Sequence, residues 1–111
     1  MNRSRWVVQP TQQANQDYVE ILHWTSQTFG ARQARIYETT LLRALRALRS
    51  GPNIIGVKKR DDLAPGILTL HAARDGRKGR HFIVFRVGGD QVIDVLRILY
   101  DGMDLTVHLP F

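Results

Sequence analysis

Hydrophobic residues recur at every third or fourth position in the first half of the chain, which predicts two amphipathic helices. The first is expected to begin after Thr11, a helix N-cap residue, and to end at Gly30. The second begins almost at once and ends at 50–52, a Ser-Gly-Pro sequence. So short a connection predicts an antiparallel helical hairpin. The apolar stripes are Ala14, Tyr18, Ile21, Leu22, Thr25 and Phe29, and then Ala34, Tyr37, Leu41, Leu45 and Leu48.

The remaining segments have the pattern of β-strands separated by turns. Alternation of residue type is clearest over 80–87, and the turns are predicted at 74–79 and at Gly88-Gly89-Asp90. The apolar run that follows does not distinguish helix from strand by its period, but its place after this turn favours a strand. The candidate strands are 5–9, 54–59, 67–73, 80–87 and 91–100, the second being the weakest.

The order of these elements is β-α-α-β-β-β, with room for one more short strand. Because the helices are grouped and the strands are mostly sequential, we expect an α+β fold of two layers, an antiparallel sheet packed against the helical hairpin. A chain of 111 residues fits one domain, which we take to span 1–111.

Composition narrows the functional classes. The chain has no cysteine, which excludes a disulfide framework and a thiolate metal site and fits a reducing compartment. The apolar run near the N-terminus is too short for a signal peptide or a membrane span, so we expect a cytoplasmic protein that does not contact membranes. A net charge of +6 and a pI of about 10.5 favour an acidic partner such as nucleic acid or an acidic protein.

No sequence motif specific to an enzyme is present. The chain lacks a P-loop, a His-Glu-x-x-His motif and a Gly-x-Ser-x-Gly motif. The four histidines have no metal-ligand spacing, so neither a metal site nor a cofactor is expected. They are His23, His71, His81 and His108.

The predicted hairpin over 74–87 carries a dense basic cluster made of Arg74, Arg77, Lys78, Arg80 and Arg86. Arg80 and Arg86 have the same parity in an apolar strand, so they should share a face and flank a groove under the helices that binds a carboxylate or phosphate. Arg77 and Lys78 are expected to be solvated at the tip. A second basic surface is predicted on the second helix, where Arg35, Arg43, Arg46 and Arg49 lie largely off the apolar stripe.

Several segments resemble the ParE/RelE toxins, and together they cover nearly the whole chain. The helical segments with this resemblance are Ala14-x-x-Asp17-Tyr18-x-x-Ile21-x-x-Trp24 and Gly30-x-x-x-Ala34-x-x-Tyr37-x-x-x-Leu41, and Pro52-x-x-x-Gly56 resembles the connection after the second helix. The central hairpin is similar through Leu70-His71-x-x-Arg74 and Gly79-Arg80-His81-Phe82-x-x-Phe85-Arg86-Val87. The end, Val95-Leu96-Arg97-Ile98-Leu99-Tyr100-Asp101-x-Met103-Asp104-x-x-x-His108-Leu109, resembles the ParE branch most specifically.

The resemblance implies the toxin of a type II toxin-antitoxin module, neutralised by a ParD-like or other protein antitoxin in a hetero-oligomer. ParE members inhibit DNA gyrase by binding and so block replication, and no catalytic site is then expected. We assign antitoxin binding to Arg74, Arg80, Phe82 and Arg86. We assign target binding to Arg43, Arg46, Arg49, Met103 and His108.

The alternative is a RelE-like endoribonuclease that cuts messenger RNA on the ribosome. Its catalytic groups would be Arg74, Arg80, Arg86, His81 and His108, and His71 is a further candidate. At position 100, where ParE members often have histidine, this chain has tyrosine. A RelE-like endoribonuclease could use that aromatic side chain.

Overall fold

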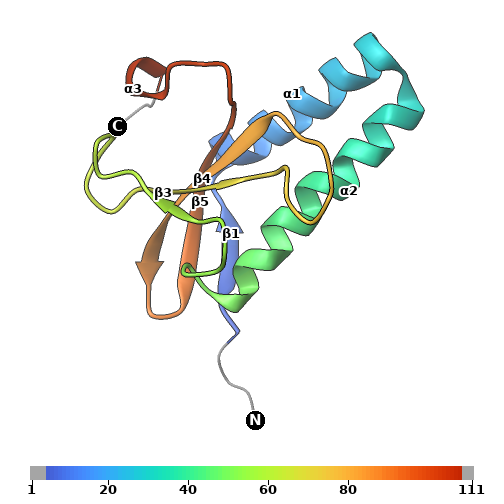
Figure 1. Ribbon diagram of the computed structural model, residues 1–111. Helices are drawn as coiled ribbons and strands as arrows, with labels where there is room; N and C mark the ends of the chain where they lie inside the picture. The colour runs from blue at the N-terminus through green and yellow to red at the C-terminus, as the bar shows by residue number, and fades with distance from the viewer. Residues whose placement is uncertain (1–4, 109–111) are drawn as a thin grey trace.

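The computed structural model describes residues 5–108, and for His108 it describes the backbone only. Two long helices lie against one face of a small twisted sheet (Figure 1). The elements are β1 (Val7–Pro10), α1 (Gln12–Phe29), α2 (Ala31–Ala47), the 3₁₀ turn η1 (Leu48–Ser50), β2 (Lys58–Lys59), β3 (Leu68–His71), β4 (His81–Gly89), β5 (Val92–Tyr100) and α3 (Leu105–His108). None of the helices within the described residues is long and apolar enough to cross a membrane.

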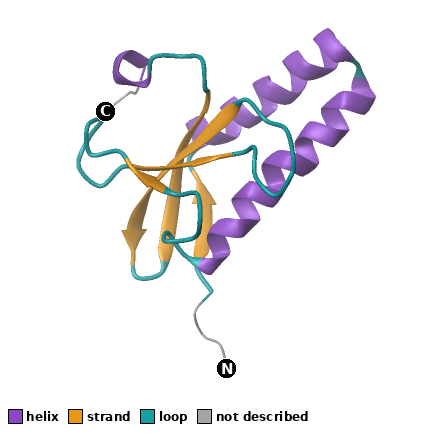
Figure 2. Ribbon diagram, viewed as in Figure 1, coloured by secondary structure: helices purple, strands orange, loops and turns teal. Residues whose placement is uncertain are grey.

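The sheet has five strands in the order β1-β5-β4-β3-β2. Figure 2 shows the strands beside the two long helices, with loops between them. The predicted antiparallel arrangement is confirmed for β2 through β5, but β1 lies parallel to β5 with Val7 opposite Val92. The sheet is therefore mixed. Its neighbours β1 and β5 are the first and last strands along the chain, and the helical hairpin and three strands separate them in sequence.

The helical hairpin forms where the periodicity predicted it. The Thr11 hydroxyl accepts a hydrogen bond from the Ala14 N–H at 3.1 Å and caps α1. Gly30 ends α1 with φ 97°, a backbone conformation that favours glycine. The Tyr18 hydroxyl then joins the two helices, because it donates to a Glu38 carboxylate oxygen at 2.9 Å.

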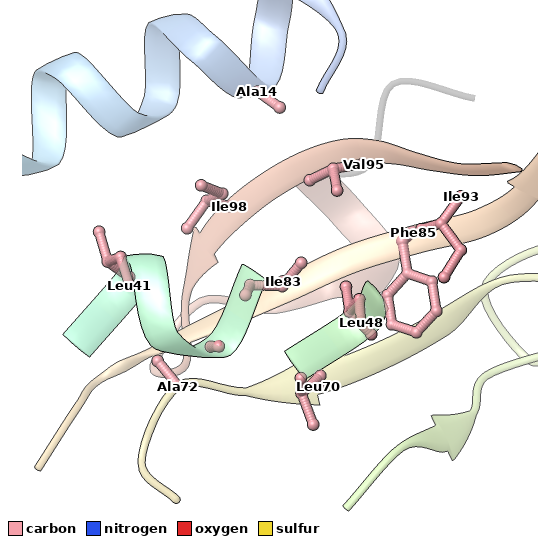
Figure 3. Packing of buried hydrophobic residues seen from close by; sticks show 11 residues of the cluster. Ala14, Leu41, Leu48, Leu70, Ala72, Ile83, Phe85, Ile93, Val95 and Ile98 are labelled. Carbon is pink, nitrogen blue, oxygen red and sulfur yellow. The ribbon is translucent and has the colours of Figure 1, made fainter. Parts of the chain in front are cut away.

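The main core lies between the hairpin and the sheet (Figure 3). Ala14, Leu41 and Leu48 from the helices are buried with Ile83 and Phe85 of β4 and with apolar residues of β3 and β5. A smaller cluster, in which Val84, Leu99 and Leu105 are buried, covers the other side of the sheet. Leu105 of α3 is buried in this cluster, while 109–111 lie outside the described residues.

The observed strands differ from their predicted limits by one or more residues, and two of the differences are instructive. Only Lys58–Lys59 of the candidate 54–59 forms a strand. Gly88 and Gly89 belong to β4, and the turn lies one step later, where Gln91 has φ 54°. Paired strands on both sides of this turn continue as far as Gly89 and Val92, so the turn is shorter than the glycines indicated.

Candidate functional site

A groove of about 670 Å³ opens between α1 and the final part of β5. It exists because β1 pairs with β5 only as far as Pro10 opposite Val95, whereas β5 continues to Tyr100. Beyond Pro10 the chain turns into α1, which lies over the unpaired edge of β5 (Figure 1). A strand edge exposes backbone donors and acceptors that an added chain can use, but on this edge the Leu96 carbonyl already accepts a hydrogen bond from the Thr11 hydroxyl at 3.1 Å.

The outer wall of the groove carries two aromatic side chains. Trp24 is 59% exposed and Phe29 is 63% exposed, although both come from the helix that covers the sheet. Their rings contact each other edge to face, with 5.7 Å between the centroids. Large exposed aromatic residues beside a groove are typical of surfaces that bind a partner.

A buried ion pair forms part of the groove lining and joins α1 to β5. Asp17 is only 7% exposed, and it accepts hydrogen bonds from Nε and Nη2 of Arg97 at 2.8 and 3.0 Å. The backbone N–H of Ile98 also donates to Asp17, at 3.0 Å. One carboxylate therefore satisfies both the guanidinium and an N–H group on the open edge of β5.

At the end of β5, Asp101 gathers a second polar cluster. Arg80 Nε donates to the Asp101 carboxylate at 3.0 Å, and another Arg80 nitrogen donates to the Tyr100 hydroxyl at 3.1 Å. His71 uses both ring nitrogens, because Nδ1 accepts from the Ala73 N–H and Nε2 therefore donates to Asp101. The hydrogen bond from His71 and the one from Arg80 hold the pKa of Asp101 below its usual value.

His81 lies next to this cluster and is held by Tyr37. The Tyr37 hydroxyl accepts from the Arg80 N–H at 3.0 Å, so its proton faces Nδ1 of His81 at 2.7 Å. Burial, the largest cause, lowers the pKa of His81 to about 4. The ring is consequently neutral at physiological pH and accepts a hydrogen bond through Nδ1.

These contacts limit the chemistry available in the groove. A general acid or base needs a group free to exchange a proton with substrate near pH 7. His71 is bound at both nitrogens, and His81 has a pKa far below neutrality. Among residues 5–108 no group of three His, Cys, Asp or Glu side chains could hold a metal ion. The apolar lining of the groove and its exposed aromatic pair, Trp24 and Phe29, are suited to binding a chain segment.

Comparison with known proteins identifies the family. The model for the ParE toxin of type II toxin-antitoxin system, parDE, matches residues 8–105. The Toxin ParE1 of Mycobacterium tuberculosis is 32% identical over 106 residues, which cover 96% of this chain and 98% of that protein. The chain belongs to the ParE toxin family.

Solved structures share the fold of this ParE-family toxin. A chain from the chromosomal ParDE TA system of P. aeruginosa superimposes with a TM-score of 0.69 at 21% identity and covers 88% of this chain and 98% of its own length. A YoeB/ParE toxin from Agrobacterium tumefaciens gives 0.56 at 19% identity, over 85% and 96%. The predicted toxin family and α+β architecture are therefore confirmed.

The structure separates the two arginines that were expected to flank one groove. Arg80 lines the groove beside α1, whereas Arg86 lines a different depression near Lys59 and Pro65. Arg80 lies just before β4 and Arg86 lies within it, and six residues of extended chain span about 20 Å, so the two guanidinium groups start far apart. Phe82, between them, packs in the cluster on the face away from the helices. The predicted groove under the helices is therefore wrong for this pair.

Two other basic residues of the β3–β4 hairpin form hydrogen bonds with other parts of the chain. Arg77 was expected to be solvated, but it donates to the Thr40 hydroxyl at 2.9 Å and to the Ile36 carbonyl at 3.2 Å. Lys78 beside it is exposed. Arg74 donates to the Ile55 carbonyl at 3.2 Å and lies 3.6 Å from Asp75. The basic turn thus packs on α2 and on the loop before β2.

The residues assigned to target binding lie on two surfaces. Arg43, Arg46 and Arg49 are exposed along α2 and η1, while Met103 lines the groove. The side chain of His108 lies outside the described residues. Of the catalytic set of the alternative function, the structure places Arg80 and His81 together in the groove and Arg86 in the other depression.

Reasoning from the sequence missed four residues that form much of the groove: Asp17, Trp24, Phe29 and Arg97. A signal was present for Asp17, because a carboxylate one turn from Ala14 on an apolar helix face needs a buried partner. Nothing local indicated that Arg97, eighty positions later, supplies it. Phe29 was predicted to be a core residue, but it lies at the end of the hairpin and beyond the sheet.

Proposed function

We propose that this ParE-family toxin inhibits DNA gyrase by binding, and that its cognate antitoxin neutralises it by filling the groove between α1 and β5. The observation that carries the proposal is the open, aromatic-lined groove whose polar groups are already hydrogen-bonded. The P. aeruginosa neighbour comes from a ParDE toxin-antitoxin system, and a hetero-oligomer of toxin and antitoxin is proposed by analogy.

Two features of the groove fit a peptide segment of the antitoxin. Trp24 and Phe29 offer apolar anchors, and the edge of β5 beyond Val95 has no neighbouring strand within the described residues. Arg80 at the rim is 64% exposed and adds a cation for an acidic side chain. The roles first assigned to Arg74, Phe82 and Arg86 remain proposals, but these residues lie outside this groove.

The endoribonuclease alternative has less support. The histidines near the groove are held by internal hydrogen bonds, and Arg86 does not join Arg80 and His81. RNA cleavage requires a proton donor and acceptor that converge on the 2′-hydroxyl. Inhibition of gyrase by binding does not require the histidines and arginines of the groove to exchange protons.

The target contact is proposed on α2 and on the rim of the groove, through Arg43, Arg46, Arg49, Met103 and His108. The test is a supercoiling reaction with relaxed plasmid, purified gyrase and purified toxin. Loss of supercoiled product, or accumulation of cleaved plasmid, is expected. Normal supercoiling together with growth arrest and truncated messenger RNA in expressing cells would instead establish the alternative.

Antitoxin binding is tested on the groove itself. Replacing Trp24 by alanine should weaken antitoxin binding about 30-fold or more, since a truncated central aromatic anchor costs about 2 kcal/mol or more. Ile55→Ala is the matched control, because Ile55 is 91% exposed and lies outside the groove. Arg80→Ala should weaken binding more than Arg86→Ala when each is measured separately by calorimetry, because Arg80 lines this groove and Arg86 lines the other depression. Equal affinities for wild type and Trp24→Ala would exclude the groove as the antitoxin site.

A further inference from the structure

The outer face of α2 is a continuous arginine surface. Arg32, Arg35, Arg43 and Arg46 are all exposed, whereas Leu41 and the other core residues of α2 point to the opposite side. At 3.6 residues per turn, the four arginines fall within an arc of about 80°. Arg32 and Arg46 are fourteen positions apart, so the surface is about 21 Å long.

These four arginines have no ion-pair partner within residues 5–108. By contrast, the five arginines at 60, 74, 80, 86 and 97 each lie within 4.0 Å of a carboxylate. The acidic residue of α2 is Glu38, which accepts the hydrogen bond of Tyr18 on the side toward α1. Within the part of the chain that the structure describes, the positive charges of the α2 surface are therefore not neutralised by ion pairs.

The same surface has little to offer an apolar partner. Ile36 is the large hydrophobic residue of α2 that is exposed, at 44%, and no aromatic residue accompanies it there. Most protein interfaces depend on buried aromatic and aliphatic anchors, so a protein target such as gyrase would contact Arg43 and Arg46 through charge alone. Guanidinium groups on a straight helix instead match a regular array of phosphates, to which they can donate two parallel hydrogen bonds.

We propose that this α2 surface binds the phosphodiester backbone of duplex nucleic acid. A B-form duplex carries one charge per about 1.7 Å, so about twelve charges pass along about 21 Å of helix. The contact would be independent of base sequence, because it is made to phosphates. It goes beyond the proposed function, since the toxin alone, without gyrase or antitoxin, is expected to bind.

The test is fluorescence anisotropy of the full chain with a labelled 20-base-pair DNA duplex, titrated from about 50 to 200 mM salt. Four phosphate contacts predict a slope of about −3.6 for the logarithm of affinity against the logarithm of salt concentration. The triple variant Arg35→Gln, Arg43→Gln, Arg46→Gln leaves one contact, so the slope should become shallower, about −0.9. Binding at the lowest salt concentration should weaken at least 10-fold. Circular dichroism checks that the exposed substitutions leave the helices intact.

The matched control removes three charges elsewhere, by Lys58→Gln, Lys59→Gln, Lys78→Gln, all exposed and on β2 or the β3–β4 turn. It should retain nearly full affinity. Equal weakening by both triple variants, or equal binding of a poly-glutamate of the same charge, would overturn the proposal. A duplex of RNA in a second arm tells which nucleic acid is preferred, and binding to either one supports the backbone contact. The gyrase reaction is independent, because failure there leaves this binding measurement unchanged.

Discussion

The groove between α1 and β5 and the outer face of α2 both carry arginines, but the fold treats them in opposite ways. In the groove Arg97 and Arg80 are held by Asp17 and Asp101, and the surrounding wall is largely apolar. On α2 the arginines are exposed, and no carboxylate among residues 5–108 forms an ion pair with them. A basic residue held by the fold contributes to stability, while a free one is available to a partner.

This difference changes how the net charge of +6 should be interpreted. The internally paired arginines are screened by their carboxylates, so the outward field of the molecule comes mainly from surfaces such as α2. The groove, in which apolar area surrounds paired charges, is better suited to a chain segment with hydrophobic anchors. The two regions are therefore suited to two partners of different chemistry: the groove to an antitoxin segment, and the α2 surface to duplex nucleic acid.

The largest effect should come from breaking the pair in the groove. Asp17→Asn removes the charge that compensates Arg97, whose side chain is only 18% exposed. Leaving one partner of a buried ion pair alone costs about 3 kcal/mol of unfolding free energy. Urea unfolding followed by circular dichroism measures this cost. Asp62→Asn, which breaks the exposed pair with Arg60, is the control and should not shift the midpoint measurably.

The contrast between local and long-range information explains what the sequence could predict. The helices follow from periodicity and caps that lie within a few residues, so their limits were predicted within a few positions. The parallel contact of β1 with β5, and hence the open edge that forms the groove, depends on a meeting of the chain ends. No local pattern encodes that meeting.

The candidate site illustrates the same limit. The equal parity of Arg80 and Arg86 says nothing of the distance between them, and six residues of extended chain, about 20 Å, separate Arg80, just before β4, from Arg86. Arg77 was expected to be solvated because it follows an Asp-Gly turn, yet that turn folds back onto α2. The exposed arginines of α2 were predictable, because helical periodicity places them opposite the core.

A smaller effect is expected from the neutral histidine beside the groove. The pKa of His81 is about 4 in the folded chain and about 6.5 in the unfolded chain, because burial disfavours the imidazolium. A lowered histidine pKa gives stability that is fully present above about pH 6.5 and is lost as the pH falls toward 4. After allowance for solvent around the partly exposed ring, we expect a loss of about 1 kcal/mol between pH 6.5 and 5.

His81→Gln isolates this contribution, because glutamine can still accept the hydrogen bond of Tyr37 but does not titrate. The stability of the variant, measured by urea unfolding at pH 6.5, 5.75 and 5, should therefore change less than that of the wild type. The carboxylate of Asp101 does not interfere, since its lowered pKa places its titration below this range. Parallel pH dependences of the two proteins would show that the ring is not protected from protonation.

The smallest effect on stability should come from α2. The triple variant Arg35→Gln, Arg43→Gln, Arg46→Gln removes three exposed charges that make no ion pair within the described residues, so the unfolding free energy should change by less than about 0.5 kcal/mol. Removing like charges from one helix face can even raise stability slightly, by relieving repulsion. A loss comparable to that of Asp17→Asn would mean that these arginines are held by the fold, and the distinction between the two regions would fail. An unchanged stability together with lost duplex binding would separate the two roles of arginine within this chain, because the same residue type would stabilise the groove and recognise a partner on α2.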